Sequence, residues 1–447
     1  LAQNILQGFA SFAEAEIAPI NASGDRAGCV LENGRVRMPA GFASVYRQLA
    51  DMGWQGLSAP EDFGGMGQGP LVAAMVSEVF SGANHAMQMV CNLVPGAIST
   101  LLAYGTERQQ ADWIPRLAGG AALSTMCLTE AGAGSDLSRI RTRAQPGAKG
   151  WVISGEKIFI SGGDQDLSED IVHLVLARTG AVADGVKGLS LFLTARSIAG
   201  PSITITRIEE KLGLHASPTC QMSFDNAPAE LIGAEGAGLK AMFTLMNHAR
   251  LDVALQGVAH AARTHAIAAA YAGARKQGRT PDGRDATLAD HADVQRMLNE
   301  QQGLAIGARA MVHVALVEMV RGEAPDLVDF LTPVCKVFGS EAGIRAADLG
   351  IQILGGYGYL SEYDVAQTWR DARITAIYEG ANGIHALATA TRGLRVQGGA
   401  GADAFDALIG RLTRSLMETS QTRVQIYVDD PVLTMCPTPE ETDRIIA

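Results

Sequence analysis

WVISGEKIFIS (Trp151–Ser161) is the first of several short runs of β-branched and large apolar residues in the middle of the chain. IVHLVLA (Ile171–Ala177), LSLFLT (Leu189–Thr194) and Ile203–Ile205 follow it, each bounded by Gly, Asp or Pro. Runs of this length between turn residues are typical of β-strands. The sequence therefore predicts a compact β domain at the centre of the chain.

Helical patterns flank the β domain on both sides. Beyond Leu239 apolar residues recur every three to four positions, most clearly between Val294 and Met319, which indicates helices with one apolar face. Helices, strands and helices in separate blocks favour an α+β multidomain protein over a doubly wound sheet. The same helical spacing at the start of the chain is carried by Leu1, Ile5, Leu6, Phe9, Phe12 and Ile17.

The changes of pattern also predict the domain boundaries. We expect an N-terminal helical domain over residues 1–124, a central β domain over 125–236 and a C-terminal helical domain over 237–395. The pattern leaves the structure of the tail, residues 396–447, open. The chain of 447 residues is long enough for this division, since domains commonly contain about 100–200 residues.

The charge and composition argue against several classes of protein. A net charge of −11 and a pI near 5.3 disfavour a nucleic-acid partner, whose phosphates attract basic surfaces. No stretch approaches the roughly 20 uninterrupted apolar residues of a membrane span. The start, Leu1-Ala2-Gln3, lacks the basic and apolar regions of a secretory signal. We therefore expect no membrane span and a cytoplasmic protein, or a mitochondrial-matrix protein if a targeting segment preceded Leu1, and not a secreted one.

Motifs of several other chemistries are absent from the sequence. It contains no G-x-x-x-x-G-K-[ST], H-E-x-x-H or G-x-S-x-G, so phosphoryl transfer, zinc hydrolysis and α/β-hydrolase chemistry lose their usual signals. GGMGQG (Gly64–Gly69) follows no strand of a βαβ unit and is interpreted as a turn. The six cysteines form no C-x-x-C pair, which favours a reducing compartment and predicts no metal site. They are Cys29, Cys91, Cys127, Cys220, Cys335 and Cys436.

Four further motifs carry little information when each is taken alone. LTEAGAGSD (Leu128–Asp136) would let a flat ring or a phosphate approach its glycines, but such a loop is more often a flexible turn. QILGGYGY (Gln352–Tyr359) is typical of a helix end and a turn, or of close approach by a ligand. GEKIFISGG (Gly155–Gly163) belongs to a strand, and RDARITAIYEG (Arg370–Gly380) contains a glutamate that alone would be expected in solvent.

Together, these four motifs resemble the signature set of the acyl-CoA dehydrogenase family. Their order and separations are similar to those of the family, and the resemblance covers about residues 1–395. A narrower likeness is carried by KIFIS, DQDLSEDIVHLVLAR, GVKGLSLFL and a shortened RKQGR. These segments resemble the longer branch that includes methylmercaptopropionyl-CoA dehydrogenase.

The resemblance implies a fold and a cofactor. Members of the family have an N-terminal α-helical domain, a central β-barrel-like domain and a C-terminal four-helix bundle. FAD lies between the last two, and a second subunit completes its site, which implies a homodimer or homotetramer. Carried onto this sequence, the residues near the FAD of their own subunit are Leu128, Thr129, Gly134, Ser135, Phe159, Ser161 and Gly380. Those that would reach the FAD of the partner subunit are Arg275, Gln277, Gln352, Gly355 and Gly356.

The resemblance also implies the chemistry. Glu379 matches the catalytic carboxylate, which removes the α-proton of an acyl-CoA thioester while flavin N5 accepts the β-hydride, giving the trans-2-enoyl-CoA. A desolvated carboxylate is a stronger base than one in water. The backbone N–H of the same glutamate and a ribityl hydroxyl polarise the thioester carbonyl. Some relatives place the base where this chain has Ala249, which cannot serve. The substrate positions are Ser135, Asn247, Arg250 and Tyr378.

The resemblance gives a substrate class and an electron acceptor as expectations. They are a short, medium or thioether-bearing acyl-CoA, such as methylmercaptopropionyl-CoA, and an electron-transferring flavoprotein. An acyl-CoA oxidase-like enzyme that uses dioxygen and a non-catalytic family member are the alternatives. Ala381 stands where a threonine is common, which predicts one flavin hydrogen bond fewer. After about Thr413 the sequence departs from the family, and Tyr427-Val428-Asp429-Asp430 is interpreted as an acidic turn rather than a metal site.

Overall fold

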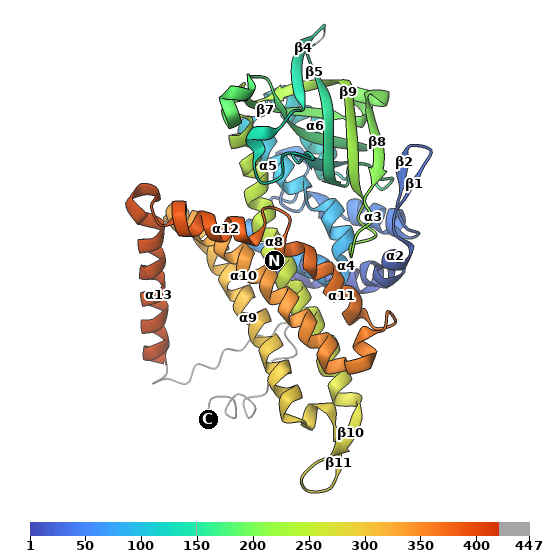
Figure 1. The fold of residues 1–447 in the computed structure, drawn as a ribbon, viewed down its shortest axis with the longest axis vertical. Coiled ribbons are helices and arrows are strands. Elements are labelled where there is room, and N and C mark those ends of the chain that lie inside the picture. The colour runs from blue at the N-terminus through green and yellow to red at the C-terminus, as the bar shows by residue number, and fades with distance from the viewer. Residues whose placement is uncertain (149, 420–447) are drawn as a thin grey trace.

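The computed structural model describes residues 1–148 and 150–419, and its elements follow the order helices, sheet, helices (Figure 1). The first part is helical apart from one hairpin. Local sequence explains one of its helix starts, because Thr106 caps α6 in a capping box with Gln109. The helices are α1 (Ala2–Phe12), α2 (Asn21–Ala27), α3 (Phe42–Asp51), α4 (Pro70–Cys91), α5 (Val94–Tyr104) and α6 (Glu107–Ala118), and the hairpin is β1 (Val30–Glu32) and β2 (Arg35–Arg37).

A seven-stranded sheet forms the middle of the molecule. Its strands pair in the order β3-β6-β4-β5-β9-β7, and β8 pairs with β9. β6 also pairs with β7, so the sheet closes on itself and is barrel-like. The strands are β3 (Ala122–Cys127), β4 (Arg143–Gly147), β5 (Gly150–Ser161), β6 (Asp170–Arg178), β7 (Leu189–Ala195), β8 (Ile203–Ile208) and β9 (Thr219–Ile232).

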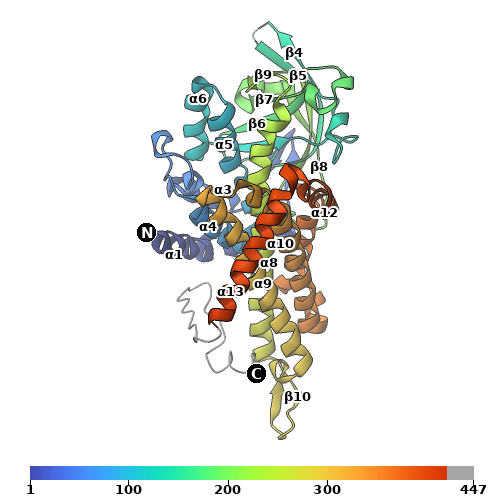
Figure 2. The ribbon, with the colours of Figure 1, turned by 90° about the vertical axis from the view of Figure 1, so that its left-hand side faces the viewer.

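Long helices form the last part of the described chain. α8, α9 and α10 pack against one another, and the hairpin β10–β11 joins α8 to α9 at the end of the molecule farthest from the sheet (Figures 1 and 2). α8 also packs against α4 and α5, and so joins the bundle of α8, α9 and α10 to the N-terminal helices α1 to α6. The elements are α8 (Gly238–Ala274), β10 (Lys276–Arg279), β11 (Asp285–Thr287), α9 (Ala292–Arg321), α10 (Pro325–Leu354), α11 (Asp364–Ala372), α12 (Asn382–Ala388) and α13 (Ala400–Thr419).

Glycines let α8 and α10 approach more closely than side chains would allow. A Cβ atom on Gly257 of α8 would lie 2.0 Å from the carbonyl oxygen of Gly339 on α10. A Cβ atom on Gly343 would lie 2.6 Å from the Gly257 carbonyl oxygen. This contact holds the two helices that carry Arg250 and Lys336 at a fixed separation, and both residues belong to the site described below.

By length and composition alone, the described part of the chain has one helix that could cross a membrane, α9, or two candidate spans if the bent pair α4 and α5 counts as one. Core helices of soluble proteins meet the same criterion, and α9 packs against both α8 and α10 through Ala305, Ala308 and Val312, all of which are buried. The absence of a membrane span therefore stays a prediction.

The expected order of helices, β domain and helices is confirmed. In the described part of the tail that the sequence left open, the structure shows a 3₁₀ turn, Val396–Gly399, and then α13, which packs against α10 through Leu408 and Phe405. The ring centroids of Phe405 and Phe330 lie 5.4 Å apart. The segment Tyr427–Asp430 lies outside the described residues.

Candidate active site

Glu379 lies on a short loop between the 3₁₀ turn Arg373–Ala376 and α12. Its backbone has φ +53°, a left-handed conformation that is uncommon for a residue with a side chain and that marks strain at functional sites. Gly380 follows with φ +94°, and a Cβ atom there would lie 2.6 Å from the imidazole of His385. The loop therefore needs glycine after the glutamate, which explains the Glu-Gly pair.

The Glu379 carboxylate is in an unusual environment for an acidic group. Oε2 is buried and has no hydrogen-bond partner among the described residues. Burial raises the pKa of Glu379 to about 7, while the charges of Arg250 and Lys336 lower it and that of Asp252 raises it. The group can therefore take up or release a proton near neutral pH, as a general base must.

The backbone of Glu379 is held on one side and free on the other. Its carbonyl oxygen accepts a hydrogen bond of 2.9 Å from Nε2 of His385. Its N–H has no acceptor within residues 1–148 and 150–419. An unpaired N–H beside an unpaired carboxylate oxygen provides a donor and a base at the same position.

Arg250 approaches this loop from α8. Its Nη1 donates to Oδ1 of Asn247 at 3.0 Å, and its guanidinium lies 5.3 Å from the ring centroid of Phe243. Its Nε is buried and has no hydrogen-bond partner in the part of the chain that the structure describes. Burial lowers the pKa of Arg250, and the charge of Glu379 opposes that change. The structure thus brings Asn247, Arg250 and Glu379 together from segments far apart in the sequence.

Tyr378 is fixed by a chain of buried polar side chains. Its hydroxyl donates to Oε1 of Gln256 and lies 3.2 Å from Nε2 of His85, which must therefore donate to it. Nδ1 of His85 then accepts from Nε2 of His260 at 2.8 Å. Burial lowers the pKa of His85 to about 4 and that of His260 well below its ordinary value, so both rings are neutral.

The other end of this chain is a buried carboxylate. Nε2 of Gln256 donates to Oδ2 of Asp252 at 2.8 Å, and Nε2 of Gln88 donates to the same oxygen at 2.9 Å. Ser77 donates to Oδ1. Burial raises the pKa of Asp252, and the hydrogen bonds from Ser77, Gln88, Gln256 and Asn92 lower it. The chain runs without a break from Asp252 to the residue that precedes Glu379.

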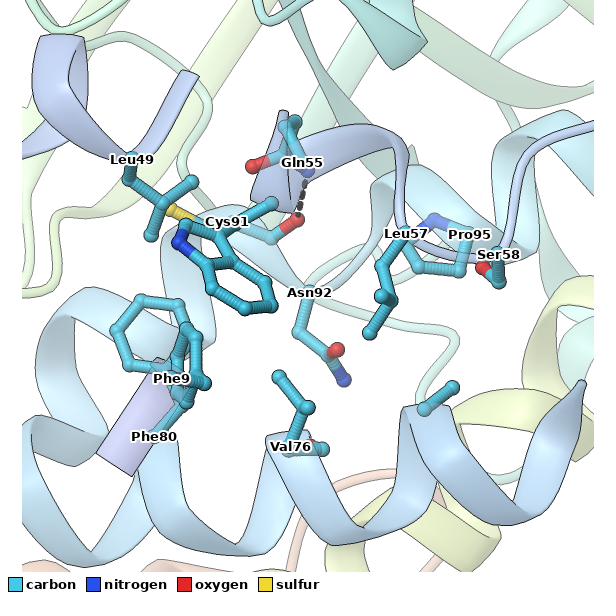
Figure 3. A pocket seen from close by; sticks show the side chains of 13 residues that line it. Phe9, Leu49, Gln55, Leu57, Ser58, Val76, Phe80, Cys91, Asn92 and Pro95 are labelled. Atoms are coloured by element: carbon cyan, nitrogen blue, oxygen red, sulfur yellow. Dashed lines mark hydrogen bonds between the residues drawn. The ribbon is translucent and has the colours of Figure 1, made fainter. Parts of the chain in front are cut away.

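A partly open cavity of about 80 Å³ lies beside Asp252 and its hydrogen-bond partners, and Figure 3 shows the side chains that line it. Ser77 and Asn92 belong to both its wall and the surroundings of Asp252, and the Asn92 amide points into the cavity. Most of the remaining wall is apolar. It includes Phe9, Leu49, Leu57, Val76 and Phe80.

The first group of predicted cofactor residues lies at the ends of β3 and β5 and on the loop between β3 and β4, apart from Gly380, which follows Glu379 before α12. The N–H of Ile158 donates to the carbonyl of Thr129 at 2.9 Å, which brings Leu128 and Thr129 next to Phe159. Phe159 is 59% exposed and has φ +57°, so an apolar ring is held outward on a strained backbone. Ser161 is half-buried. Gly134 and Ser135 are exposed on the adjoining loop, and a Cβ atom on Gly134 would meet nothing within 4 Å.

The second group lies at the far end of the bundle. Five of its members line one open cavity whose volume is about 660 Å³, between β10, α9 and the end of α10. A side chain on Gly355 or Gly356 would meet nothing within 4 Å, so this wall has room for a ligand. The structure therefore divides the predicted cofactor residues into two sets and does not bring them together within one chain. The five are Arg275, Gln277, Gln352, Gly355 and Gly356.

Sequence reasoning missed several residues that support the site. Lys157 is fully buried, and its Nζ donates to Oε1 of Glu130 at 2.9 Å and to the carbonyl of Leu128 at 3.0 Å. Lys336 is also fully buried and donates to the Glu379 loop. The available signal was a lysine inside an apolar run, Val334-Cys335-Lys336-Val337-Phe338. The residues His85, Gln256 and His260 gave no signal, because isolated polar residues on a long helix are usually surface residues.

No cluster of three or more His, Cys, Asp or Glu residues that could hold a metal ion occurs within residues 1–148 and 150–419.

Three family descriptions match the chain in succession. They are "Acyl-CoA dehydrogenase, N-terminal domain" over residues 2–121, "middle domain" over 125–227 and "C-terminal domain" over 236–394. Among curated proteins, 3-methylmercaptopropionyl-CoA dehydrogenase of Ruegeria pomeroyi is 42% identical over 429 residues, which cover 91% of this chain and 73% of that protein.

Solved structures give the same result. Butyryl-CoA dehydrogenase from Megasphaera elsdenii is similar with a TM-score of 0.78 at 26% identity, covering 88% of this chain and 98% of that one. A chain from work on the electron transferring flavoprotein of Acidaminococcus fermentans has a TM-score of 0.78 at 27% identity, again over 88% and 98%.

Proposed function

The chain belongs to the acyl-CoA dehydrogenase family of FAD-dependent oxidoreductases that act on acyl-CoA, and we propose that Glu379 is the base that removes the α-proton of its substrate. The observation that carries this proposal is the Glu379 carboxylate itself. Its Oε2 is buried without a donor from residues 1–148 or 150–419, its backbone is left-handed, and its pKa is raised to about 7. A carboxylate that served only to stabilise the fold would be paired with a donor.

The site can perform the two tasks that α-proton removal requires. The α-hydrogen of a thioester is weakly acidic, so the base must be close and the carbonyl oxygen must be stabilised as negative charge develops. Glu379 supplies the base, and its free backbone N–H supplies a hydrogen-bond donor for that oxygen. Arg250 and Lys336 keep the carboxylate partly ionised near neutral pH.

FAD, when bound, accepts the hydride from the β-carbon. The residues present fit this cofactor. Phe159 offers an exposed apolar ring beside Thr129 and Ser161, and Gly134 leaves its backbone accessible. In our proposal these residues hold the flavin end of FAD.

The wall that contains Arg275, Gln277, Gln352, Gly355 and Gly356 would bind the FAD of a partner subunit. One observation supports a shared site: these residues line a cavity of their own at the far end of the bundle, separate from the first group of predicted cofactor residues. Under this proposal a homodimer is the smallest active unit. Size-exclusion chromatography with light scattering, together with activity, tests it, because a fully active monomer would contradict a shared site.

For the substrate, we propose a short or medium acyl-CoA with a thioether in its acyl chain, such as methylmercaptopropionyl-CoA. The 42% identity to a dehydrogenase of that substrate supports this assignment. A series of acyl-CoA substrates should give the highest kcat/KM for chains of about three to six carbon atoms or their thioether analogues. A maximum for long-chain substrates would contradict the assignment.

We further propose that an electron-transferring flavoprotein reoxidises the enzyme. The similarity to a chain studied together with such a flavoprotein supports this partner.

The experiment that tests the activity is an anaerobic titration of the purified holoenzyme with this series, followed by the visible absorbance of the flavin. Bleaching by one of the substrates is the expected result. Bleaching by none of them would refute the proposed activity. Oxygen uptake that matches turnover would instead favour an oxidase.

A further inference from the structure

The loop that carries Glu379 is attached to the bundle through two consecutive carbonyl groups. Nε2 of His385 donates to the carbonyl of Glu379 at 2.9 Å. Nζ of Lys336 donates to the carbonyl of Gly380 at 2.8 Å. The first bond comes from α12, which begins directly after the loop, and the second comes from the middle of α10. Of the two hydrogen bonds, the one from Lys336 therefore joins the loop to a helix distant in the sequence.

These attachments matter because nothing fixes the carboxylate at its other end. Oε2 of Glu379 has no donor among the described residues, so no hydrogen bond to that oxygen orients it. The left-handed conformations of Glu379 and Gly380 must instead be maintained by groups that bind their backbone. Small displacements of a reacting group reduce catalysis strongly, so these backbone contacts bear directly on the rate.

Lys336 is a costly residue to place at this position. It is fully buried, and its two hydrogen-bond acceptors, the Gly380 carbonyl and Oδ1 of Asn382 at 2.8 Å, are both neutral. Asn382 is held in turn by Ser340 at 3.0 Å and by Glu341 at 2.7 Å. An ammonium group without a directly paired carboxylate destabilises a folded protein, and Met of similar length would avoid that cost.

We propose that Lys336 is a positioning residue for Glu379, which it serves by holding the Gly380 carbonyl and by placing a positive charge near the carboxylate. This inference rests on the proposed role of Glu379 as base. The hydrogen bond fixes the loop, and the charge favours the ionised carboxylate that accepts the α-proton. The two effects are separable, because one depends on geometry and the other on charge.

The charges around Glu379 determine the direction of the second effect. From α8, Arg250 lowers the pKa of Glu379 and Asp252 raises it; from α10, Lys336 lowers it. On α12, burial lowers the pKa of His385, so the ring is neutral and acts only through its hydrogen bond. The Tyr378 hydroxyl is neutral because burial raises its pKa well above the ordinary value. Burial lowers the pKa of Lys336, the charges of Glu379 and Glu341 raise it, and the charge of Arg250 lowers it. Loss of Lys336 leaves Arg250 as the remaining cation and raises the pKa of Glu379.

The test is Lys336→Met in the FAD-loaded enzyme. The limiting rate of flavin reduction should fall about ten-fold or more, because the base is less well placed. That rate falls at low pH as Glu379 becomes protonated. The pH at which it falls should rise by about one unit, because the carboxylate is harder to ionise. KM should change little. Lys240→Met removes a lysine from an exposed position at the start of α8 and should leave both quantities unchanged.

Two further measurements separate the effect of Lys336 on the loop from its effect on the charge of Glu379. Hydrogen–deuterium exchange of the segment 377–384 should be faster in Lys336→Met than in the wild type, with or without substrate. Asn382→Ala removes one acceptor but keeps the lysine, so it should loosen the segment while leaving the pH at which the rate falls unchanged. If neither variant changes exchange or flavin reduction, Lys336 does not position Glu379.

Glu379→Gln, measured in parallel, separates the two proposals. If this variant reduces flavin normally, the proposed base is wrong. If it is inactive while Lys336→Met keeps the wild-type rate and pH profile, the base is right and the inference on Lys336 is wrong.

Discussion

Tyr378 and His85 are joined by a hydrogen bond of 3.2 Å between the tyrosine hydroxyl and Nε2, although 293 residues separate them in the sequence. The bond connects α4 of the first part of the chain to the loop that carries Glu379. It also sets the direction of the buried chain from His260 to Asp252, because Tyr378 gives its only proton to Gln256. The residue before the candidate base is therefore anchored to two other parts of the protein.

Tyr378→Phe should destabilise the protein and slow flavin reduction. Without the hydroxyl, Oε1 of Gln256 and the N–H of His85 lose a partner in a buried site. Each unpaired buried group costs about 1–3 kcal/mol, so the loss in unfolding free energy should lie in that range or above it. The holoenzyme is compared with the wild type by chemical denaturation and stopped-flow absorbance.

His85→Asn is the companion variant for this prediction. Its shorter side chain breaks the bonds to Tyr378 and His260 but leaves the tyrosine on Gln256. We expect a smaller rate effect than that of Tyr378→Phe. Equal stability of Tyr378→Phe and the wild type would mean that the chain of hydrogen bonds contributes nothing.

The rate of flavin reduction should depend on pH through the ionisation of Glu379. Burial raises the pKa of this group to about 7, and only the deprotonated form accepts the α-proton. The limiting rate should therefore be low at acidic pH, rise through about pH 7 and level off above it. If the rate instead rose near pH 4.5, the ordinary pKa of glutamate, the carboxylate would not be desolvated in the working enzyme.

Lys157→Met should weaken FAD binding. Lys157 joins Glu130 to the Leu128 carbonyl beneath the loop that we propose lines the flavin. Its removal leaves Glu130 with only the backbone N–H groups of Arg141 and Thr142. Breaking a buried ion pair costs about 3–5 kcal/mol, part of which should appear as at least a ten-fold higher Kd for FAD. Fluorescence titration of the apoenzyme with FAD measures it.

The double variant Lys157→Met with Glu130→Gln is the control for charge. It leaves no unpaired buried charge, so it should recover part of the stability but not the tight FAD binding. An unchanged Kd in the single variant would separate this ion pair from the cofactor site.

Gly257→Ala should strongly destabilise the bundle. The new Cβ atom would lie 2.0 Å from the Gly339 carbonyl oxygen, so α8 and α10 must move apart. Such overpacking typically costs about 1–3 kcal/mol or more. Gly273→Ala on the same helix meets nothing within 4 Å and should stabilise α8 by up to about 1 kcal/mol. Thermal unfolding of the two variants should therefore shift in opposite directions. If Gly257→Ala were as stable as Gly273→Ala, the close helix contact would be absent in solution.

The sequence was sufficient for the block order of the fold but not for the whole sheet. The runs beginning at Trp151, Ile171, Leu189 and Ile203 are strands β5 to β8, because they alternate with turn residues and contain β-branched or large apolar side chains. β9 was missed since its second half, Asp225–Glu230, is polar or small and pairs only with strands distant in sequence. Closure of the sheet through β6 and β7 depends on pairing that no local pattern records.

For the site, the motifs located Glu379 and its neighbours along the chain, but local sequence could not identify the groups that change the pKa of Glu379. Lys336 lies 43 positions before Glu379 and Arg250 lies on another helix, so their effect on its pKa follows from packing alone. His85 reaches Tyr378 only because α4 packs against α8. The assignment of Arg275 and Gly355 to a partner's cofactor came from the family resemblance, and it stays a prediction.

The most direct test of the central claim compares wild type and Glu379→Gln holoenzymes, mixed anaerobically with methylmercaptopropionyl-CoA or butanoyl-CoA. Flavin absorbance and exchange of the substrate's α-hydrogen in D₂O are followed together. Glutamine keeps the shape of the side chain and removes the base. We expect FAD to stay bound in Glu379→Gln, and both flavin bleaching and α-hydrogen exchange to fall by about four orders of magnitude or more. Bleaching and exchange at wild-type rates in Glu379→Gln would contradict this expectation and place the base elsewhere.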